Sequence, residues 1–86
     1  MVEYAVTFAL SARRELEGFP RSVVTRVVTR IESLGISPRP AGCRKLQSRG
    51  ALYRIRIGDY RVIYSVDDEK RVVDVVAVRH RSDAYR

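Results

Sequence analysis

The feature that most constrains the fold of this chain is a pair of alternating segments on either side of Gly58-Asp59. Apolar or aromatic side chains recur at every second position from Leu52 to Ile57 and again from Tyr60 to Val66. Such alternation is typical of strands with one buried face, and Gly-Asp suits a two-residue hairpin turn. The sequence therefore predicts a β-hairpin in which Arg56 pairs with Arg61.

Two more segments have the character of strands. Residues 72–78 are nearly all β-branched, which favours a buried strand, and polar turn residues at 67–70 connect this segment to the hairpin. Residues 4–10 alternate between large apolar and smaller side chains, which predicts a half-buried strand near the N-terminus. The segment 36–50 is rich in proline and glycine and is expected to form a loop.

Two helices are predicted between the first strand and this loop. Ser11 is placed to cap a short helix that runs through Glu17 and stops at Gly18. Pro20 suits the first turn of a second helix, which Gly35 ends. Its apolar residues fall on one face at helical spacing: Val24, Val27, Val28, Ile31 and Leu34.

These elements define one domain, residues 1–86, in the order β-α-α-β-β-β. We expect an α+β fold in which the two N-terminal helices pack on one face of a small antiparallel β-sheet. A chain of 86 residues is long enough for one compact core. The second face of the sheet is then available to a ligand.

Signals for export, membrane insertion and disulfide formation are weak. The longest apolar runs span four or five residues, far short of a membrane helix, and residues 1–20 carry several charges that a signal peptide would lack. We therefore expect a cytoplasmic protein without a membrane partner. The single cysteine, Cys43, cannot form an internal disulfide and has no metal-ligating neighbours in the sequence.

Positive charge dominates the composition. The formal net charge is +7, the isoelectric point is about 10.3, and most of the 17 basic residues are arginine. This balance predicts a polyanionic partner, with nucleic acid ahead of acidic protein and anionic lipid, and arginine suits phosphate better than lysine does. A genome that favours arginine codons would give the same bias, and both explanations stay open. The excess lies mainly in residues 44–86, where we expect the site.

Alternation across the hairpin sorts its side chains into two faces. The face expected against the helices holds Tyr53, Ile55, Ile57, Tyr60, Val62 and Tyr64. The other face holds Arg54, Arg56 and Arg61, with Asp74 expected on the same face one strand over. Like charges on paired strands destabilise a sheet, so the cluster predicts an anion-binding face. The alternative is a solvated sheet face with ordinary charge repulsion.

The C-terminal segment, residues 78–86, holds the only histidine of the chain, His80, between Arg79 and Arg81. Histidine exchanges protons near neutral pH, and flanking cations favour its neutral form. Strict alternation places Arg79 on the core side of its strand, unless the strand ends or twists near Val78. The alternative for this segment is a frayed basic tail.

These residue types fit a ribonuclease that needs no metal ion. Such an enzyme positions a ribose 2′-hydroxyl for in-line attack on the adjacent phosphate, and clustered arginines stabilise the charge on the phosphoryl oxygens. A histidine can move the protons. A single histidine excludes a two-histidine acid–base pair, and the sequence has no carboxylate cluster that would predict a two-metal site. No cofactor is expected.

Several of these motifs resemble the RelE/ParE toxin superfamily. The resemblance rests on Lys45-Leu46, on the YRIRI stretch at 53–57, on GDYRVIY at 58–64, and on Arg79-His80-Arg81 with Tyr85, and it spans nearly the whole chain. It implies a RelE-like fold with two N-terminal helices on a small antiparallel sheet. It also implies a toxin of a type II toxin–antitoxin system that cleaves mRNA in the ribosomal decoding site and is neutralised by a cognate antitoxin.

The resemblance implies roles for three residues by position. Arg61 matches the family's phosphate-stabilising arginine, and Arg79 matches the arginine assigned to leaving-group protonation or charge stabilisation. Tyr85 matches the C-terminal tyrosine that stacks on the RNA base or orients it.

Two positions depart from the family pattern. Arg54 and Arg56 stand where the best-known member has lysines. Because arginine keeps its proton, both are expected to act as electrostatic clamps and not as bases. Proton removal then falls to His80, to water, or to the ribosomal RNA. We expect cleavage that is weak or strictly dependent on the ribosome.

The expected partners are mRNA on the ribosome, ribosomal RNA and the antitoxin. Arg44, Lys45 and Arg49 are predicted to contact ribosomal RNA, with a solvated loop as the alternative, and Arg81 is predicted to contact RNA. An acidic or amphipathic antitoxin segment is expected to cover the arginine face. Two other functions stay open: a ParE-like gyrase poison, and a module that binds antitoxin or RNA without cleaving.

Overall fold

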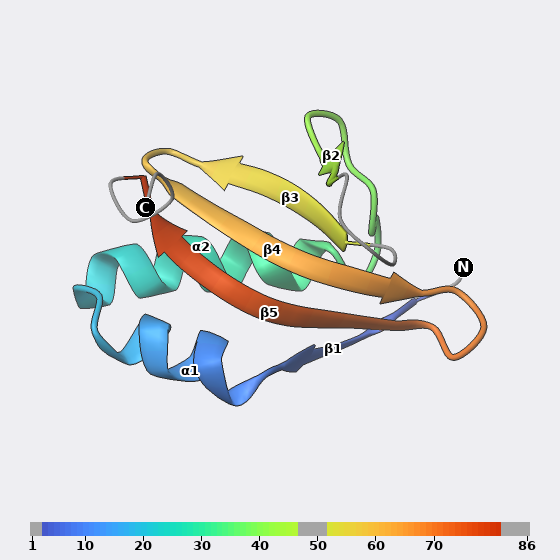
Figure 1. The fold of residues 1–86 in the computed structure, drawn as a ribbon, viewed down its shortest axis with the longest axis horizontal. Coiled ribbons are helices and arrows are strands. Elements are labelled where there is room, and N and C mark those ends of the chain that lie inside the picture. The colour runs from blue at the N-terminus through green and yellow to red at the C-terminus, as the bar shows by residue number, and fades with distance from the viewer. Residues whose placement is uncertain (1–2, 47–51, 82–86) are drawn as a thin grey trace.

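Two helices and five strands make up the part of the chain that the structure, a computed structural model, describes, residues 3–46 and 52–81 (Figure 1). The helices are α1 (Leu10–Glu17) and α2 (Arg21–Ser33). The strands are β1 (Ala5–Phe8), β2 (Arg44–Lys45), β3 (Leu52–Ile57), β4 (Tyr60–Asp67) and β5 (Val72–His80). The predicted α+β class and the two N-terminal helices are confirmed.

The strands form one sheet in the order β1-β5-β4-β3-β2. The predicted hairpin is confirmed, because β3 and β4 are antiparallel with Arg56 opposite Arg61 and Ile57 opposite Tyr60. β5 is antiparallel to β4, as predicted. The sheet is not antiparallel throughout, because β1 pairs in parallel with β5 at the far edge. Alternation identifies a strand but not its partner, so the sequence pattern did not indicate this parallel pair.

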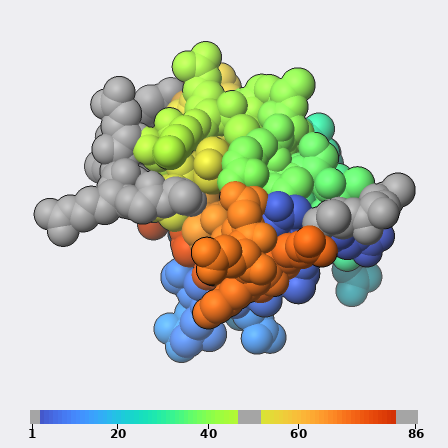
Figure 2. Space-filling view, turned by 90° about the vertical axis from the view of Figure 1, so that its right-hand side faces the viewer, coloured from blue at the N-terminus to red at the C-terminus, as the bar shows by residue number. Residues whose placement is uncertain are grey.

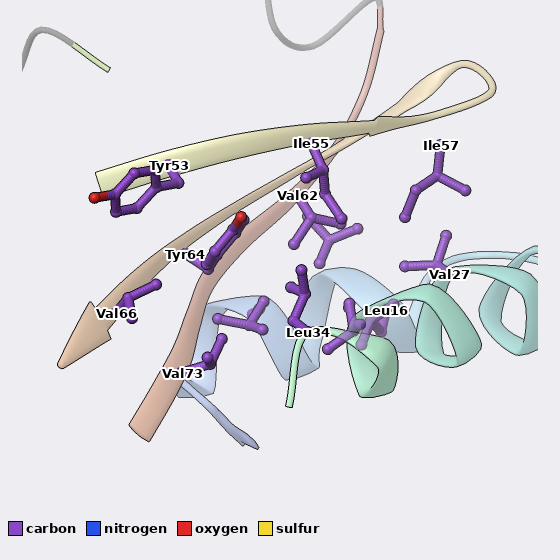
Figure 3. Close-up of a cluster of buried hydrophobic side chains, with 14 residues drawn as sticks. Leu16, Val27, Leu34, Tyr53, Ile55, Ile57, Val62, Tyr64, Val66 and Val73 are labelled. Carbon is purple, nitrogen blue, oxygen red and sulfur yellow. The ribbon is translucent and has the colours of Figure 1, made fainter. Parts of the chain in front are cut away.

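The core lies between the sheet and the helices. Figure 1 shows α2 behind the sheet and α1 below β5, where it continues from β1. The predicted core face of the hairpin is confirmed, because Tyr53, Ile55, Ile57, Val62 and Tyr64 are all buried. They pack against α1 and α2 through Ala12, Leu16, Val27 and Ile31, and with Leu34 at the end of α2 (Figure 3). Burying each large aliphatic side chain contributes about 1.5–3 kcal/mol.

The start of α1 differs from the prediction. Ser11 does not cap the helix, because α1 already begins at Leu10 and its N-cap residue, Ala9, makes no side-chain cap. The Ser11 hydroxyl lies one residue inside the helix and donates to the Val76 carbonyl at 2.8 Å. Tertiary contact with β5 therefore replaces the local cap that the sequence suggested.

The second helix ends near the predicted place. α2 follows Pro20 and ends at Ser33, with Leu34 as its C-cap. Gly35 comes next and meets the start of the chain, since its carbonyl accepts the amide of Tyr4 at 2.7 Å. A Cβ at position 35 would lie 2.9 Å from the Tyr4 carbonyl, so only glycine allows this approach. In the two described ranges, neither helix is long and apolar enough to cross a membrane.

The loop after α2 is fixed to the sheet by polar contacts. The buried Tyr64 hydroxyl donates to the Pro38 carbonyl at 2.7 Å, and Arg39 forms an ion pair with Asp68 at 2.8 Å. Figure 2 shows this end of the molecule, where the green loop lies beside the orange β4–β5 turn and the dark blue start of the chain. Part of the predicted loop 36–50 is a strand, because β2 pairs with β3.

Candidate functional site

A pocket of about 190 Å³ opens on the sheet face that the helices leave uncovered. It is lined by Leu46, Arg54, Arg61, Ile63 and Arg79. Arg54 lies opposite Ile63 in the β3–β4 register, and both side chains alternate with core residues, so they point away from the helices. The predicted arginine face therefore exists, and three guanidinium groups share one concave surface with two aliphatic side chains.

The register explains why these arginines converge. Arg56 of β3 is paired with Arg61 of β4, and Arg61 is paired in turn with Arg79 of β5. Adjacent strands lie about 4.8 Å apart, so the three residues form a row of like charges across the sheet. Arg54 stands two residues before Arg56 on the same face of β3. Like charges on neighbouring strands destabilise a sheet. An anion that contacts several of these cations would offset the repulsion between them.

A β-bulge in β5 brings Arg79 to this face. Ile63 pairs with Ala77 but its neighbour Tyr64 pairs with Val75, so Val76 is an extra residue in β5. The extra residue reverses the alternation beyond it. Arg79 then lies opposite Arg61 and lines the pocket, whereas strict alternation had placed it on the core side. The bulge, and not an early end of the strand, therefore puts Arg79 on the outer face, because β5 continues to His80.

The edge of β5 beyond the bulge is held by α1. β1 pairs with β5 only as far as Val75. Farther along, the carboxylate of Glu15 accepts the Val78 amide at Oε1 (2.8 Å) and pairs with Nε of Arg79 at Oε2 (3.0 Å). Sequence reasoning missed Glu15, since its only signal is a position one helical turn after Ser11, on the side of α1 that faces β5.

Comparison with known proteins places this architecture in a family. Residues 6–85 match the family model described as the ParE toxin of type II toxin–antitoxin systems, parDE. The chain belongs to the RelE/ParE toxin family. The toxin RelG of Mycobacterium tuberculosis is 33% identical to it over 84 residues, which cover 96% of this chain and 97% of RelG.

Solved structures of RelE toxins share the fold. The toxin–antitoxin complex RelBE2 of Mycobacterium tuberculosis matches with a TM-score of 0.84 and 34% identity, over 96% of this chain and 97% of the matched chain. The archaeal RelE-RelB complex of Pyrococcus horikoshii matches with a TM-score of 0.82 and 31% identity, over 94% and 97% of the two chains. The intact E. coli RelBE complex matches with a TM-score of 0.77 and 30% identity, over 90% of this chain and 95% of the matched chain.

His80 of this RelE-like chain lies apart from the arginine pocket. It pairs with Tyr60 in the β4–β5 register, on the side of the sheet that faces the helices. The His80 and Tyr60 rings meet edge to face with their centroids 5.0 Å apart. The centroids of the Tyr60 and Phe19 rings are 4.9 Å apart. Among the described residues that line the pocket, His80 does not occur. The predicted acid–base histidine is therefore one strand position away from the cations but on the opposite face.

Two carboxylates bear on the charge of the arginine face: Asp74, which the sequence predicted there, and Glu15, which the structure adds. Asp74 lies on the outer face, as predicted, because it pairs with Ser65 next to the buried Tyr64. Its carboxylate accepts the Thr7 hydroxyl at 2.7 Å. Asp74 thus contacts Thr7, whereas Glu15 forms an ion pair with Arg79 of the arginine pocket.

The other predicted RNA contacts have different outcomes. Arg44 lies in β2 opposite Arg54, and thus extends the basic face to the edge of the sheet. Lys45 is exposed beside it, opposite Tyr53. The Arg81 amide donates to the Asp59 carbonyl at 2.6 Å, which ties the end of β5 to the hairpin turn. Arg49 and Tyr85 lie outside the described residues.

The chemistry that this toxin fold offers is cationic. Within residues 3–46 and 52–81, no three His, Cys, Asp or Glu side chains gather as metal ligands. The pocket offers three guanidinium groups with fixed positive charge, beside aliphatic walls from Leu46 and Ile63. Such a surface can hold a phosphate and stabilise added negative charge on it.

Proposed function

We propose that this chain is a ribosome-dependent endoribonuclease that cleaves mRNA in the decoding site and thereby inhibits translation. The observation that carries the proposal is the convergence of Arg54, Arg61 and Arg79 on one pocket of the uncovered sheet face. Membership of the RelE/ParE family supports it, as does the match to RelE structures. We place the working compartment in the cytoplasm, where ribosomes translate.

The reaction is an attack by a ribose 2′-oxygen on the adjacent phosphorus. The 2′-oxygen–phosphorus bond forms and the bond from phosphorus to the 5′-oxygen of the next nucleotide breaks, which leaves a 2′,3′-cyclic phosphate and a 5′-hydroxyl. One proton leaves the 2′-hydroxyl and one reaches the departing 5′-oxygen. Arg61 stands in the middle of the arginine row, so we assign it to the phosphoryl oxygens, with Arg54 beside it.

Arg79 stands at the β5 end of the row, and we assign it to the leaving oxygen. A guanidinium stabilises negative charge on that oxygen by hydrogen bonding without giving up its own proton. The row therefore contains no general base, and His80 faces the other side of the sheet. Water or a ribosomal RNA group then removes the 2′-proton, and water gives a proton to the departing 5′-oxygen, whose charge Arg79 stabilises. The ribosome thereby becomes part of the catalytic apparatus, which accounts for the weak or strictly ribosome-dependent cleavage that we expect.

Cleavage of a programmed ribosome tests this function. Wild type should cut the mRNA on the ribosome and leave the same mRNA intact in solution, and Arg61→Ala and Arg79→Ala should each slow cleavage by about a hundredfold or more. Arg30→Ala, an exposed arginine on α2, is the matched charge control and should cut normally. A wild-type protein that never cuts would remove the catalytic proposal.

A second candidate is a gyrase poison, favoured by the match to a family model that is described as the ParE toxin. Such a protein would trigger a DNA-break response in cells and leave ribosome-bound mRNA intact. The arginine pocket speaks for the ribonuclease, because a poison of a protein complex has no need for a phosphate site in this place.

We also propose that a cognate antitoxin covers the arginine face. The matched complexes RelBE2, RelE-RelB and RelBE each contain a toxin with its antitoxin. Carboxylates of an acidic segment can pair with Arg54, Arg56 or Arg61. RNA contacts from Arg44, Lys45, Arg49 and Arg81 and stacking by Tyr85 belong to the same proposal. Binding to the ribosome should then weaken steeply as salt rises.

A further inference from the structure

The contact between α1 and the end of β5 gives one arginine of the pocket a fixed position. We infer that Glu15 is a positioning residue for RNA cleavage, because its carboxylate holds Nε of Arg79 and thereby aims the terminal nitrogens of that guanidinium into the arginine pocket. The inference rests on the proposed ribonuclease function and adds a residue of α1 to the site. Glu15 acts through Arg79 and does not itself touch RNA.

One carboxylate joins two consecutive residues. Its Oε1 accepts the backbone amide of Val78 at 2.8 Å, and its Oε2 lies 3.0 Å from Nε of Arg79. The backbone bond fixes the carboxylate relative to β5, so the ion pair fixes the side chain of Arg79 relative to its own strand. An exposed ion pair alone orients little, but a carboxylate already tied to a backbone amide has lost most of the freedom that the pair would have to restrict.

The fold provides this contact because two features meet at the same edge. The bulge at Val76 turns Arg79 toward the pocket, and the end of β1 leaves the amide of Val78 without a strand partner on that side. α1 follows β1 directly and runs along this edge, where Ser11 binds the Val76 carbonyl and Glu15, one turn later, binds the Val78 amide. The two side chains take the place of a neighbouring strand.

Arg79 needs such a partner for electrostatic reasons. It is paired directly with Arg61, and two guanidinium groups side by side repel each other. Without a counter-charge, the half-exposed side chain of Arg79 would turn toward solvent. A guanidinium has five N–H donors, so the pair at Nε is compatible with phosphate contacts from the terminal nitrogens. Glu15 thus offsets the repulsion and leaves Arg79 able to bind the reacting phosphate.

The test compares single-turnover cleavage on programmed ribosomes for Glu15→Gln and wild type. Glutamine keeps an acceptor for the Val78 amide and removes the charge, so the protein should fold normally. We expect cleavage about tenfold slower with ribosome affinity changed less than about twofold, since the ground state loses no RNA contact. Glu17→Gln removes the same charge from an exposed position of α1 and should cut like wild type. An equal loss in both variants overturns the inference.

A double-mutant cycle separates positioning from a structural role. If Glu15 acts through Arg79, then Glu15→Gln should cause no further slowing in an Arg79→Ala background. Slowing by the same factor in both backgrounds would mean that Glu15 only supports the edge of β5, and the inference would be wrong.

The NMR signal of the Arg79 Nε–H group gives a readout without RNA. In wild type this proton should exchange slowly with water, and in Glu15→Gln it should exchange markedly faster. An unchanged exchange rate overturns the inference even for a protein that cuts mRNA. A wild type that fails to cut while its Arg79 signal is protected would instead overturn the proposed function, and Glu15 would remain the group that holds Arg79.

Discussion

At the scale of single residues, the arginine face divides into residues that line the pocket and one that lies beside it. Arg54, Arg61 and Arg79 line the pocket, whereas Arg56 is exposed at the hairpin end of the row. All four side chains share one face, so their charge acts together on an approaching polyanion. Because Arg54, Arg61 and Arg79 line one pocket, we expect these three to share a bound phosphate, and Arg56 to contribute mainly through its charge.

A comparison of two arginines of β3 tests this division. Arg54→Ala should slow cleavage on the ribosome by about a hundredfold, because it removes a donor that lines the pocket. Arg56→Ala removes the same charge two residues farther along and should slow cleavage by less than about fivefold at saturating ribosomes. Single-turnover rates on a programmed ribosome measure both effects. Equal losses would show that net charge matters and the pocket does not.

His80 gives a second prediction at this scale. Its ring stands edge to face on Tyr60, on the side of the sheet opposite the arginines. His80→Phe keeps this aromatic contact and abolishes proton transfer, so we expect cleavage within about threefold of wild type, with the same dependence on pH. A large loss of rate in His80→Phe, with normal stability, would show that His80 moves the proton after all.

At the scale of elements, the bulge in β5 decides which face Arg79 occupies. The bulge lies opposite the step from Ile63 to Tyr64, and Tyr64 is fully buried at that step. Its hydroxyl reaches across to the Pro38 carbonyl in the loop after α2. Burial raises the pKa of the Tyr64 phenol above its ordinary value of 10.0.

Replacement of Tyr64 by phenylalanine tests the value of this contact. Tyr64→Phe should lower the free energy of unfolding at pH 7 by about 1–2 kcal/mol, because the variant loses one buried hydrogen bond and leaves the Pro38 carbonyl short of a donor. Since the folded pKa is raised, the contribution of the phenol is complete below pH 10 and is lost as pH rises further. Urea unfolding at pH 7 and above pH 10 should show the difference narrowing. A constant difference would contradict it.

Local sequence patterns predicted the hairpin and its faces well, and longer-range features less well. Alternation fixes which side chains share a face, so Arg54, Arg56 and Arg61 were grouped from sequence alone. A run such as residues 72–78 is β-branched on both faces, so it carries no sign that Val76 is a bulge. Glu15 lies 64 positions before Arg79, and helical periodicity does not reveal which strand edge a helix side will meet.

At the scale of the whole molecule, one polar cluster joins four segments that are distant in sequence. Asp68 in the β4–β5 turn accepts the Tyr4 hydroxyl at 2.7 Å and pairs with Arg39 of the loop at 2.8 Å. Arg39 also donates to the Tyr53 hydroxyl at 3.1 Å and lies over that ring. The cluster lies at the end of the sheet away from the hairpin turn. Tyr53 precedes the pocket residue Arg54 in β3, but the two side chains point to opposite faces of the sheet.

The cluster predicts a pH-dependent contribution to stability. Hydrogen bonds from Arg39 and then Tyr4 hold the pKa of Asp68 below its ordinary value of 3.8. A lowered folded pKa means that the unfolded chain binds protons first as pH falls, so stability from Asp68 is complete above about pH 4 and is lost as pH drops through the lower folded value. Asp68→Asn should therefore lower Tm by about 2 °C at pH 7, a small effect because the pair is exposed.

A matched control variant and the dependence on salt and acid test whether the charge of Asp68 is what stabilises the turn. Glu69→Gln changes the same charge in the same exposed turn and should leave Tm at pH 7 unchanged. The difference in Tm between Asp68→Asn and wild type should shrink in 1 M salt, where the Debye length falls to about 3 Å. It should disappear in acid below the folded pKa of Asp68. Thermal unfolding followed by circular dichroism measures all three. A difference that persists unchanged at low pH would mean that Asp68 stabilises the turn through its shape and not through its charge. Because Asp68 does not line the arginine pocket, Asp68→Asn should cleave mRNA on the ribosome at the wild-type rate at temperatures below its Tm. That result would separate contacts that stabilise the fold from contacts needed for cleavage.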